Sequence, residues 1–266
     1  MVKKLIKYDF MSFFRVIFPI QLILLGIALL NRLIQFFEND SIVYGIIFIS
    51  SVVLIVISSI VCLVMTTVLA IVRYYKGLYS NEGYLSFTLP VTVNQHLISK
   101  LIVAILFNLG SVFSIFLAFC VASLGEVNIE IFKAAGYLLE QFYNLYSYHA
   151  TFIIIEVIFW VLSYIIYSYL LIYFCIAIGQ LAKKAKVLAA FGVYFAYYVL
   201  TQILATVIII FLNISKYSEK ILIFMSSIKA ADLEWKIGFL IIFYIVLSVV
   251  FYLVNKIITT KKLNLT

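Results

Sequence analysis

The run IVYGIIFISSVVLIVISSIVCLVMTTVLAIV, residues 42–72, contains no charged side chain. A helix of about 20 apolar residues is enough to cross a lipid bilayer. This run is therefore longer than one crossing requires, and we expect its end to project from the membrane into the cytoplasm as a helix. A continuous apolar segment of this kind indicates a membrane-spanning chain.

The composition of the whole chain agrees with that interpretation. Its 266 residues are 66% hydrophobic and 11% charged, and the mean hydropathy is +1.21. A soluble domain typically has roughly 45–50% apolar and about 25% charged residues. These values exclude a soluble enzyme, a nucleic-acid-binding domain and a disordered tail.

Six apolar runs of membrane-spanning length follow one another along the chain. The sequence therefore predicts an all-α, polytopic membrane protein with six transmembrane helices, forming a single domain over residues 1–266. Two outer loops, 125–150 and 213–236, are long enough to hold short helices at Ile131–Tyr146 and Ile221–Ile228. The predicted spans are 16–37, 42–72, 97–124, 151–178, 187–212 and 237–258.

The distribution of basic residues predicts the orientation. With both termini in the cytoplasm, 13 of the 19 Lys and Arg residues lie on the inner side, against two acids, Asp9 and Glu82. Lys and Arg are retained on the cytoplasmic side of membrane proteins. The inner basic residues are Lys3, Lys4, Lys7, Arg15, Arg73, Lys76, Lys100, Lys183, Lys184, Lys186, Lys256, Lys261 and Lys262.

The first 15 residues show a helical amphipathic pattern. Wound as a helix, residues 2–17 place their basic side chains on one arc and Phe10, Phe13 and Ile17 on the opposite arc. This pattern favours a helix that lies flat at the cytoplasmic lipid–water boundary. Asp9 interrupts the apolar arc, and it either pairs with a basic residue of the helix bundle or reaches water.

Residues suited to catalysis are scarce. The two histidines, His96 and His149, fall at opposite membrane faces and cannot share a metal site, and no metal ligands are predicted. Three cysteines lie separately inside apolar runs, which is typical of buried small side chains. No GxxxxGK[ST] segment occurs, so ATP hydrolysis would require a partner subunit.

The loop over residues 73–92 is unusually apolar and aromatic for an inner loop. Its segment Arg73–Pro90 reads RYYKGLYSNEGYLSFTLP, and Thr92 and Gln95 form a capping box that begins the third span. Aromatic side chains with a few charges are typical of a protein docking surface. The alternative is that these side chains lie among the lipid headgroups, where Tyr is also favoured.

This loop resembles the RxYKxLxxxEGYLxxTLPV segment of bacterial ATP-binding-cassette exporter permeases of the type-2 class, especially those of Firmicutes. Three other segments resemble the same family in the same order. They are Lys7–Phe10 with Arg15 and Pro19, Ile178–Lys186 (IGQLAKKAK), and Lys261–Leu265 (KKLNL).

The resemblance implies a permease subunit that lacks catalytic residues and works in the bacterial cell membrane with a second, identical or different, permease. In such proteins a coupling helix between spans two and three seats on a cytoplasmic ATPase, which binds ATP and Mg²⁺. The cargo class would be an amphipathic peptide, an antimicrobial or a lipid-like compound. The implied coupling residues are Arg73, Lys76, Tyr79, Glu82, Gly83, Tyr84, Leu85, Leu89 and Pro90.

Polar residues within the spans allow two interpretations. They either permit close helix packing or line a substrate pathway or the seam between two permeases. Glu156 is the only acid within a span, and it lies near the outer interface or faces a polar cavity or partner. The other candidates are Ser51, Ser58 and Thr66 in span two, and Tyr194, Tyr198 and Gln202 in span five.

A rival function is a non-transporting immunity or sensor protein that binds a partner or a toxic peptide in the membrane. The loop over residues 73–92 distinguishes the two functions. Only in a permease would this loop be required for association with an ATPase. Nucleic acid is not an expected partner of either. Membrane lipid is expected for both.

Overall fold

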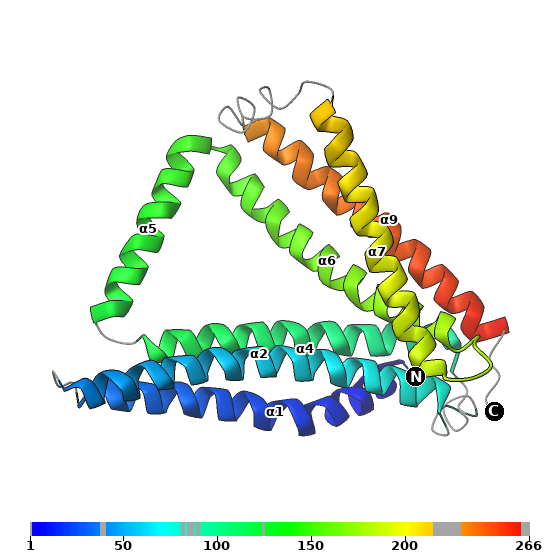
Figure 1. Ribbon diagram of the computed structural model, residues 1–266, viewed down its shortest axis with the longest axis horizontal. Coiled ribbons are helices and arrows are strands. Elements are labelled where there is room, and N and C mark those ends of the chain that lie inside the picture. The colour runs from blue at the N-terminus through cyan, green and yellow to red at the C-terminus, as the bar shows by residue number, and fades with distance from the viewer. Residues whose placement is uncertain are drawn as a thin grey trace. The chain divides into compact units, whose positions relative to one another are not determined.

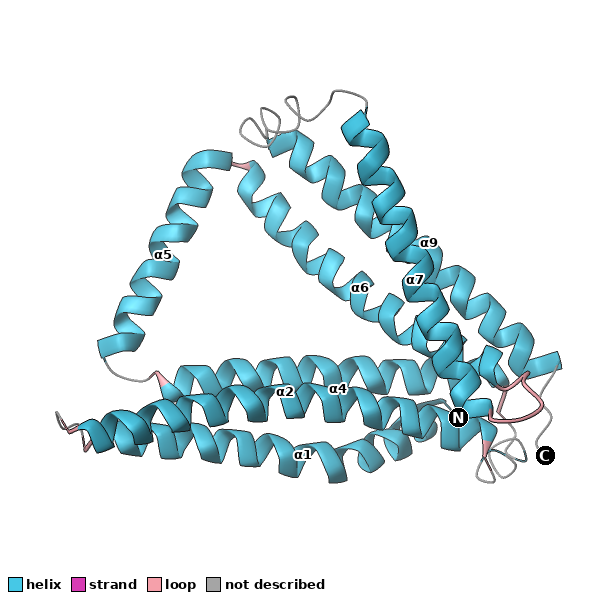
Figure 2. Ribbon diagram, viewed as in Figure 1, coloured by secondary structure: helices cyan, strands magenta, loops and turns pink. Residues whose placement is uncertain are grey.

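A computed structural model describes residues 2–37, 41–80, 83, 88, 91–123, 126–214 and 230–261. Within these ranges the regular structure is entirely helical (Figure 2). The helices are α1 (Val2–Gln35), α2 (Ile42–Tyr79), α4 (Val93–Ala122), α5 (Glu126–Tyr146), α6 (His149–Gly179), α7 (Lys186–Ile214) and α9 (Ala230–Lys261).

Six of these helices, all except α5, are long and apolar enough to cross a membrane. This confirms an all-α, multi-pass membrane protein with the six predicted spans. The boundaries differ from the prediction mainly because the helices continue beyond their apolar runs. α2 continues to Tyr79, and its 38 residues give a length of about 57 Å, nearly twice the hydrocarbon thickness of a bilayer.

Helix starts follow the local capping chemistry. The Ser41 hydroxyl accepts a hydrogen bond from the backbone N–H of Tyr44 at the start of α2. At the start of α4, the Thr92 N–H donates to the Gln95 side chain, as the capping box predicted.

In the first outer loop, α5 begins at Glu126, five residues before the helix predicted from Ile131.

The chain divides into two compact units, residues 1–139 and 140–266, where the sequence predicted a single domain. In the first unit, α1, α2 and α4 lie side by side and each contacts the other two (Figure 1). In the second unit, α6 contacts both α7 and α9. Each unit is therefore a small helical bundle with its own interior.

The separate N-terminal helix is not confirmed, because α1 runs without a break from Val2 to Gln35. The apolar arc that was expected to face lipid instead packs on α4. Phe10 and Phe13 place their rings 4.9 and 5.2 Å from that of Phe107, and Ile17 is fully buried. Pro19 removes one backbone donor but does not end the helix.

The first unit has an interior of small side chains. Ala28 of α1, Cys62 of α2 and Ala118 of α4 are fully buried together with Leu24. Helices in a membrane gain little from the hydrophobic effect on packing together, so small residues that permit close contact stabilise them instead. The cysteine is here a small buried side chain, as predicted.

The second unit packs mainly through aromatic rings. Tyr167 and Phe174 of α6 contact Phe251 of α9, with ring centroids 5.9 and 4.8 Å apart. Tyr197 of α7 also contacts Phe251, and its hydroxyl hydrogen-bonds that of Tyr167. The aromatic cluster thus joins all three helices.

The second outer loop is only partly described. α7 continues to Ile214 and α9 begins at Ala230. The helix predicted at Ile221–Ile228 lies outside the described residues.

Candidate functional site

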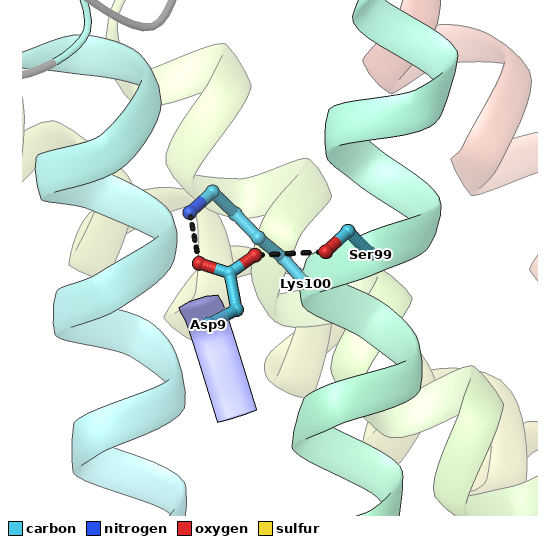
Figure 3. A network of polar contacts seen from close by, with 3 residues as sticks. All are labelled: Asp9, Ser99 and Lys100. Carbon is cyan, nitrogen blue, oxygen red and sulfur yellow. Dashed lines mark hydrogen bonds and ion pairs between the residues drawn. The ribbon is translucent and has the colours of Figure 1, made fainter. Parts of the chain in front are cut away.

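A charged cluster lies at the end of the first unit that carries the chain's N-terminal segment (Figure 3). The Asp9 carboxylate has one oxygen 3.6 Å from the Lys100 ammonium, and its other oxygen accepts a hydrogen bond of 2.8 Å from the Ser99 hydroxyl. The side chains of Lys100 and Asp9 are 10% and 21% exposed. Of the two alternatives for Asp9, pairing with a basic residue of the bundle is therefore confirmed.

Gly77 of α2 completes this cluster. A Cβ atom at position 77 would lie 2.5 Å from the Lys100 nitrogen and 2.9 Å from its Cε atom. Gly77 thus gives the Lys100 ammonium space directly against α2, and a larger residue there would require the end of the lysine side chain to shift. We call Asp9, Gly77, Ser99 and Lys100 the lysine cluster, and it brings α1, α2 and α4 together at one point.

The last turns of α2 include the start of the predicted coupling segment. Tyr74 and Leu78 are fully buried, and Tyr74 packs edge-on against Tyr79. Leu78 is covered by the chain itself, so this part of the apolar segment needs no partner to shield it from water. Arg73 and Tyr79 are half-buried and Lys76 is exposed.

Gly83 is buried beside the same end of α2. Its added Cβ would lie 2.7 Å from the backbone oxygen of Leu78, so this glycine allows a close approach to the helix end. The other implied coupling residues lie outside the described residues. They are Glu82, Tyr84, Leu85, Leu89 and Pro90.

The candidates in span two make contacts inside the first unit. The Thr66 and Ser111 hydroxyls are 2.7 Å apart, and both side chains are fully buried. Ser51 accepts a hydrogen bond of 2.6 Å from the Asn31 amide. Ser58 donates only to the carbonyl of Ile55 in its own helix. These contacts favour the packing interpretation for Ser51 and Thr66.

Glu156 lies in α6, and one of its oxygens is buried without a hydrogen-bond partner among the described residues. It interacts electrostatically with Glu234 of α9. Glu234 in turn lies 2.8 Å from the Nδ1 atom of His149 at the start of α6. The beginning of the α6–α9 pair therefore holds the paired His149 and Glu234, and Glu156 lies about two helical turns further along α6.

The candidates in span five lie on an exposed side of α7. Tyr194 and Tyr198 are 45% and 53% exposed, and Gln202 is also exposed. Tyr198 and Gln202 both line a groove along α7, and Glu156, on α6, is not among the residues that line it.

Metal binding finds no support in the described part of the chain, where no group of three His, Cys, Asp or Glu side chains could hold an ion. His96 belongs to the first unit and is buried, whereas His149 is paired with Glu234 in the second.

Three long-range contacts were beyond sequence reasoning. Lys100 had been counted only as an inner charge, and the pairings His149–Glu234 and Thr66–Ser111 join residues 85 and 45 positions apart. The usable signal was that Thr66, Lys100 and Ser111 each interrupt an apolar run. Comparisons with protein-family models, curated proteins and solved structures find no match for this chain.

Proposed function

We propose that this chain is the permease subunit of an ATP-driven exporter and that a separate ATPase subunit drives it. The observation that carries the proposal is the length of α2, which extends beyond a membrane crossing to Tyr79, into the aromatic segment Arg73–Pro90 that resembles a coupling element. A long rigid helix that ends at such a segment can transmit a movement from outside the membrane into it.

The lysine cluster supports this function because it fixes the end of α2 to its neighbours. Lys100 passes closely by Gly77 and pairs with Asp9, so a displacement of α2 at this point also acts on α1 and α4. Packed helices move between discrete arrangements rather than deforming continuously. A push on the segment after Tyr79 would then move the first unit as one body.

The proposal includes a location and partners. The chain lies in a bacterial cell membrane with both termini in the cytoplasm, as its basic residues favour. The partner ATPase binds ATP and Mg²⁺, and a second permease completes the assembly. The rival function, an immunity or sensor protein, requires no such ATPase.

Affinity purification of the full chain from its native membrane tests the proposal. A protein with a GxxxxGK[ST] segment should co-purify with it. The double variant Glu82→Ala/Tyr84→Ala should lose this protein, because it removes a charge and an aromatic anchor from the coupling segment. It should still insert into the membrane in normal amounts.

The matched control is Glu140→Ala/Tyr137→Ala, which removes the same two residue types from the exposed side of α5. This variant should retain the ATPase. Intact chain that purifies without any P-loop protein would refute the proposal and favour the rival function. Retention of the ATPase by the coupling-segment variant would exclude the assigned docking site.

A further inference from the structure

An apolar groove of about 480 Å³ lies between α6 and α9, in the middle of both helices. Pockets for small molecules typically have volumes of about 300–1,000 Å³ and apolar walls with a few polar groups. This groove fits that description, with Phe159 and Leu170 on α6 and Ile245 and Val249 on α9. We call it the α6–α9 groove.

A buried hydroxyl in the wall of the groove has no partner. Ser248 is 7% exposed, and its Oγ atom forms no hydrogen bond among the described residues. Serines in helices usually donate to a carbonyl three or four residues earlier, as Ser163 does to Trp160 across the same groove. The Ser248 hydroxyl therefore remains available to a bound molecule.

An acidic side chain lies one helical turn beyond the lining residues of the groove. Glu156 is three residues before Phe159, one helical turn towards His149, and one of its oxygens is buried without a partner. The indole N–H of Trp160 is likewise buried and unpaired within the described residues. An ionisable side chain inside a membrane is costly unless it has a partner or a functional role.

Among the described residues, neither ion pair involves Glu156. The nearby Glu234 is also acidic and is already paired with His149. These three groups therefore comprise two acidic side chains and one basic one, and the basic one is already paired with Glu234.

We propose that the α6–α9 groove binds an amphipathic cation. The cationic group pairs with Glu156, and a single apolar tail fills the groove beside Ser248. Glu156 attracts a cation and repels an anion, and a neutral tail alone would leave its carboxylate unpaired. That this ligand is also the cargo rests on the proposed function, but its binding to the groove does not.

Photolabelling of the full chain in nanodiscs of zwitterionic lipid tests the site without any ATPase or ATP. One probe is a long-chain alkyltrimethylammonium with a diazirine in its tail, and the other is the alcohol with the same tail. The ammonium probe should label residues 159–170 and 241–252 at lower concentration than the alcohol. Equal labelling by both probes, or labelling elsewhere, would overturn the proposal.

Two pairs of variants separate the charge from the groove. Glu156→Gln should weaken labelling by the ammonium probe at least about tenfold, to the level of the alcohol, as expected for the loss of a charge-assisted contact. Its control, Glu140→Gln on the exposed side of α5, should have no effect. An unchanged ammonium affinity in Glu156→Gln would refute the charge assignment.

Val249→Trp fills the groove from its exposed rim and should reduce labelling by both probes. Val250→Trp adds the same bulk at a similarly exposed neighbour outside the groove and should leave labelling unchanged. This pair tests the groove even where Glu156→Gln fails to fold. If the cation binds but no ATPase co-purifies with the chain, the site stands and the proposed function fails.

Discussion

Polar side chains join helices in both units, but the second unit also leaves several buried polar atoms without a partner among the described residues. In the first unit they join helices: Asn31 bonds Ser51, Thr66 bonds Ser111, and Asp9 bonds both Ser99 and Lys100. In α6 and α9 of the second unit, Glu156, Trp160 and Ser248 leave polar atoms buried and unpaired within the described residues.

This difference suggests different tasks for the two units. Satisfied polar contacts fix the register of helices in a membrane. Unpaired buried polar atoms are costly, and they are retained where a ligand or partner can satisfy them. In the proposed function, the first unit would transmit movement, and in the proposed binding site, the second unit would hold a molecule.

The largest effect is expected when the lysine cluster loses its anion. Asp9→Ala should lower the free energy of unfolding by about 3 kcal/mol, because Lys100 then remains buried without a counter-charge. Unfolding by SDS in mixed micelles measures this. The double variant Asp9→Leu/Lys100→Met should recover most of the loss, and Lys133→Ala on the exposed side of α5 is the control. A stable Asp9→Ala protein would mean that polar contacts do not hold the first unit together.

Close packing should matter more than polar contacts in the second unit. A Cβ atom at Gly179 would lie 2.7 Å from the backbone nitrogen of Ala190, and backbone cannot move aside as a side chain does. Gly179→Val should therefore destabilise the protein by about 2 kcal/mol. The control is Gly192→Val, a position with open space around it, and equal stability of the two variants would contradict this account.

A smaller loss is expected from Thr66→Val, which keeps the side-chain shape but removes the hydroxyl bonded to Ser111. It should cost about 1 kcal/mol, because a buried polar partner remains. Thr67→Val is the matched control, since the Thr67 hydroxyl bonds only the carbonyl of Leu63 in its own helix. A double-mutant cycle with Ser111→Ala measures the interaction energy between the two hydroxyls. An interaction energy of zero would mean that this contact does not stabilise the first unit.

The smallest effect should come from Tyr167→Phe. It deletes the hydrogen bond to Tyr197 but keeps the ring contacts with Tyr244 and Phe251. Hydrogen bonds between membrane helices contribute on average about 0.6 kcal/mol, so the loss should be no larger than that. A loss as large as that of Asp9→Ala would erase the contrast between the units.

Sequence reasoning succeeded where the signal is local. The six spans follow from apolar length alone, and the start of α4 follows from Thr92 and Gln95. It was less successful for the amphipathic N-terminal segment. A helix with one apolar face packs equally well against lipid or against another helix, and periodicity does not distinguish them.

The candidate site was only partly predictable for a related reason. A polar residue in an apolar run signals that a partner is needed, and Asp9 and Glu156 were both recognised in this way. The sequence does not say which partner, because contacts such as Asp9–Lys100 depend on how helices distant in sequence come together.

By itself, the sequence determined that this chain is an all-helical protein of the membrane. The transfer of a long apolar segment from water into lipid depends on the length and composition of that segment and not on which helices pack against it. Only the tertiary structure decided that Gly77 lies against the end of Lys100, that Leu78 is covered by its own chain, and that Glu156 has a buried oxygen without a partner among the described residues. Each of these depends on distances between helices, which packing sets and no single segment encodes.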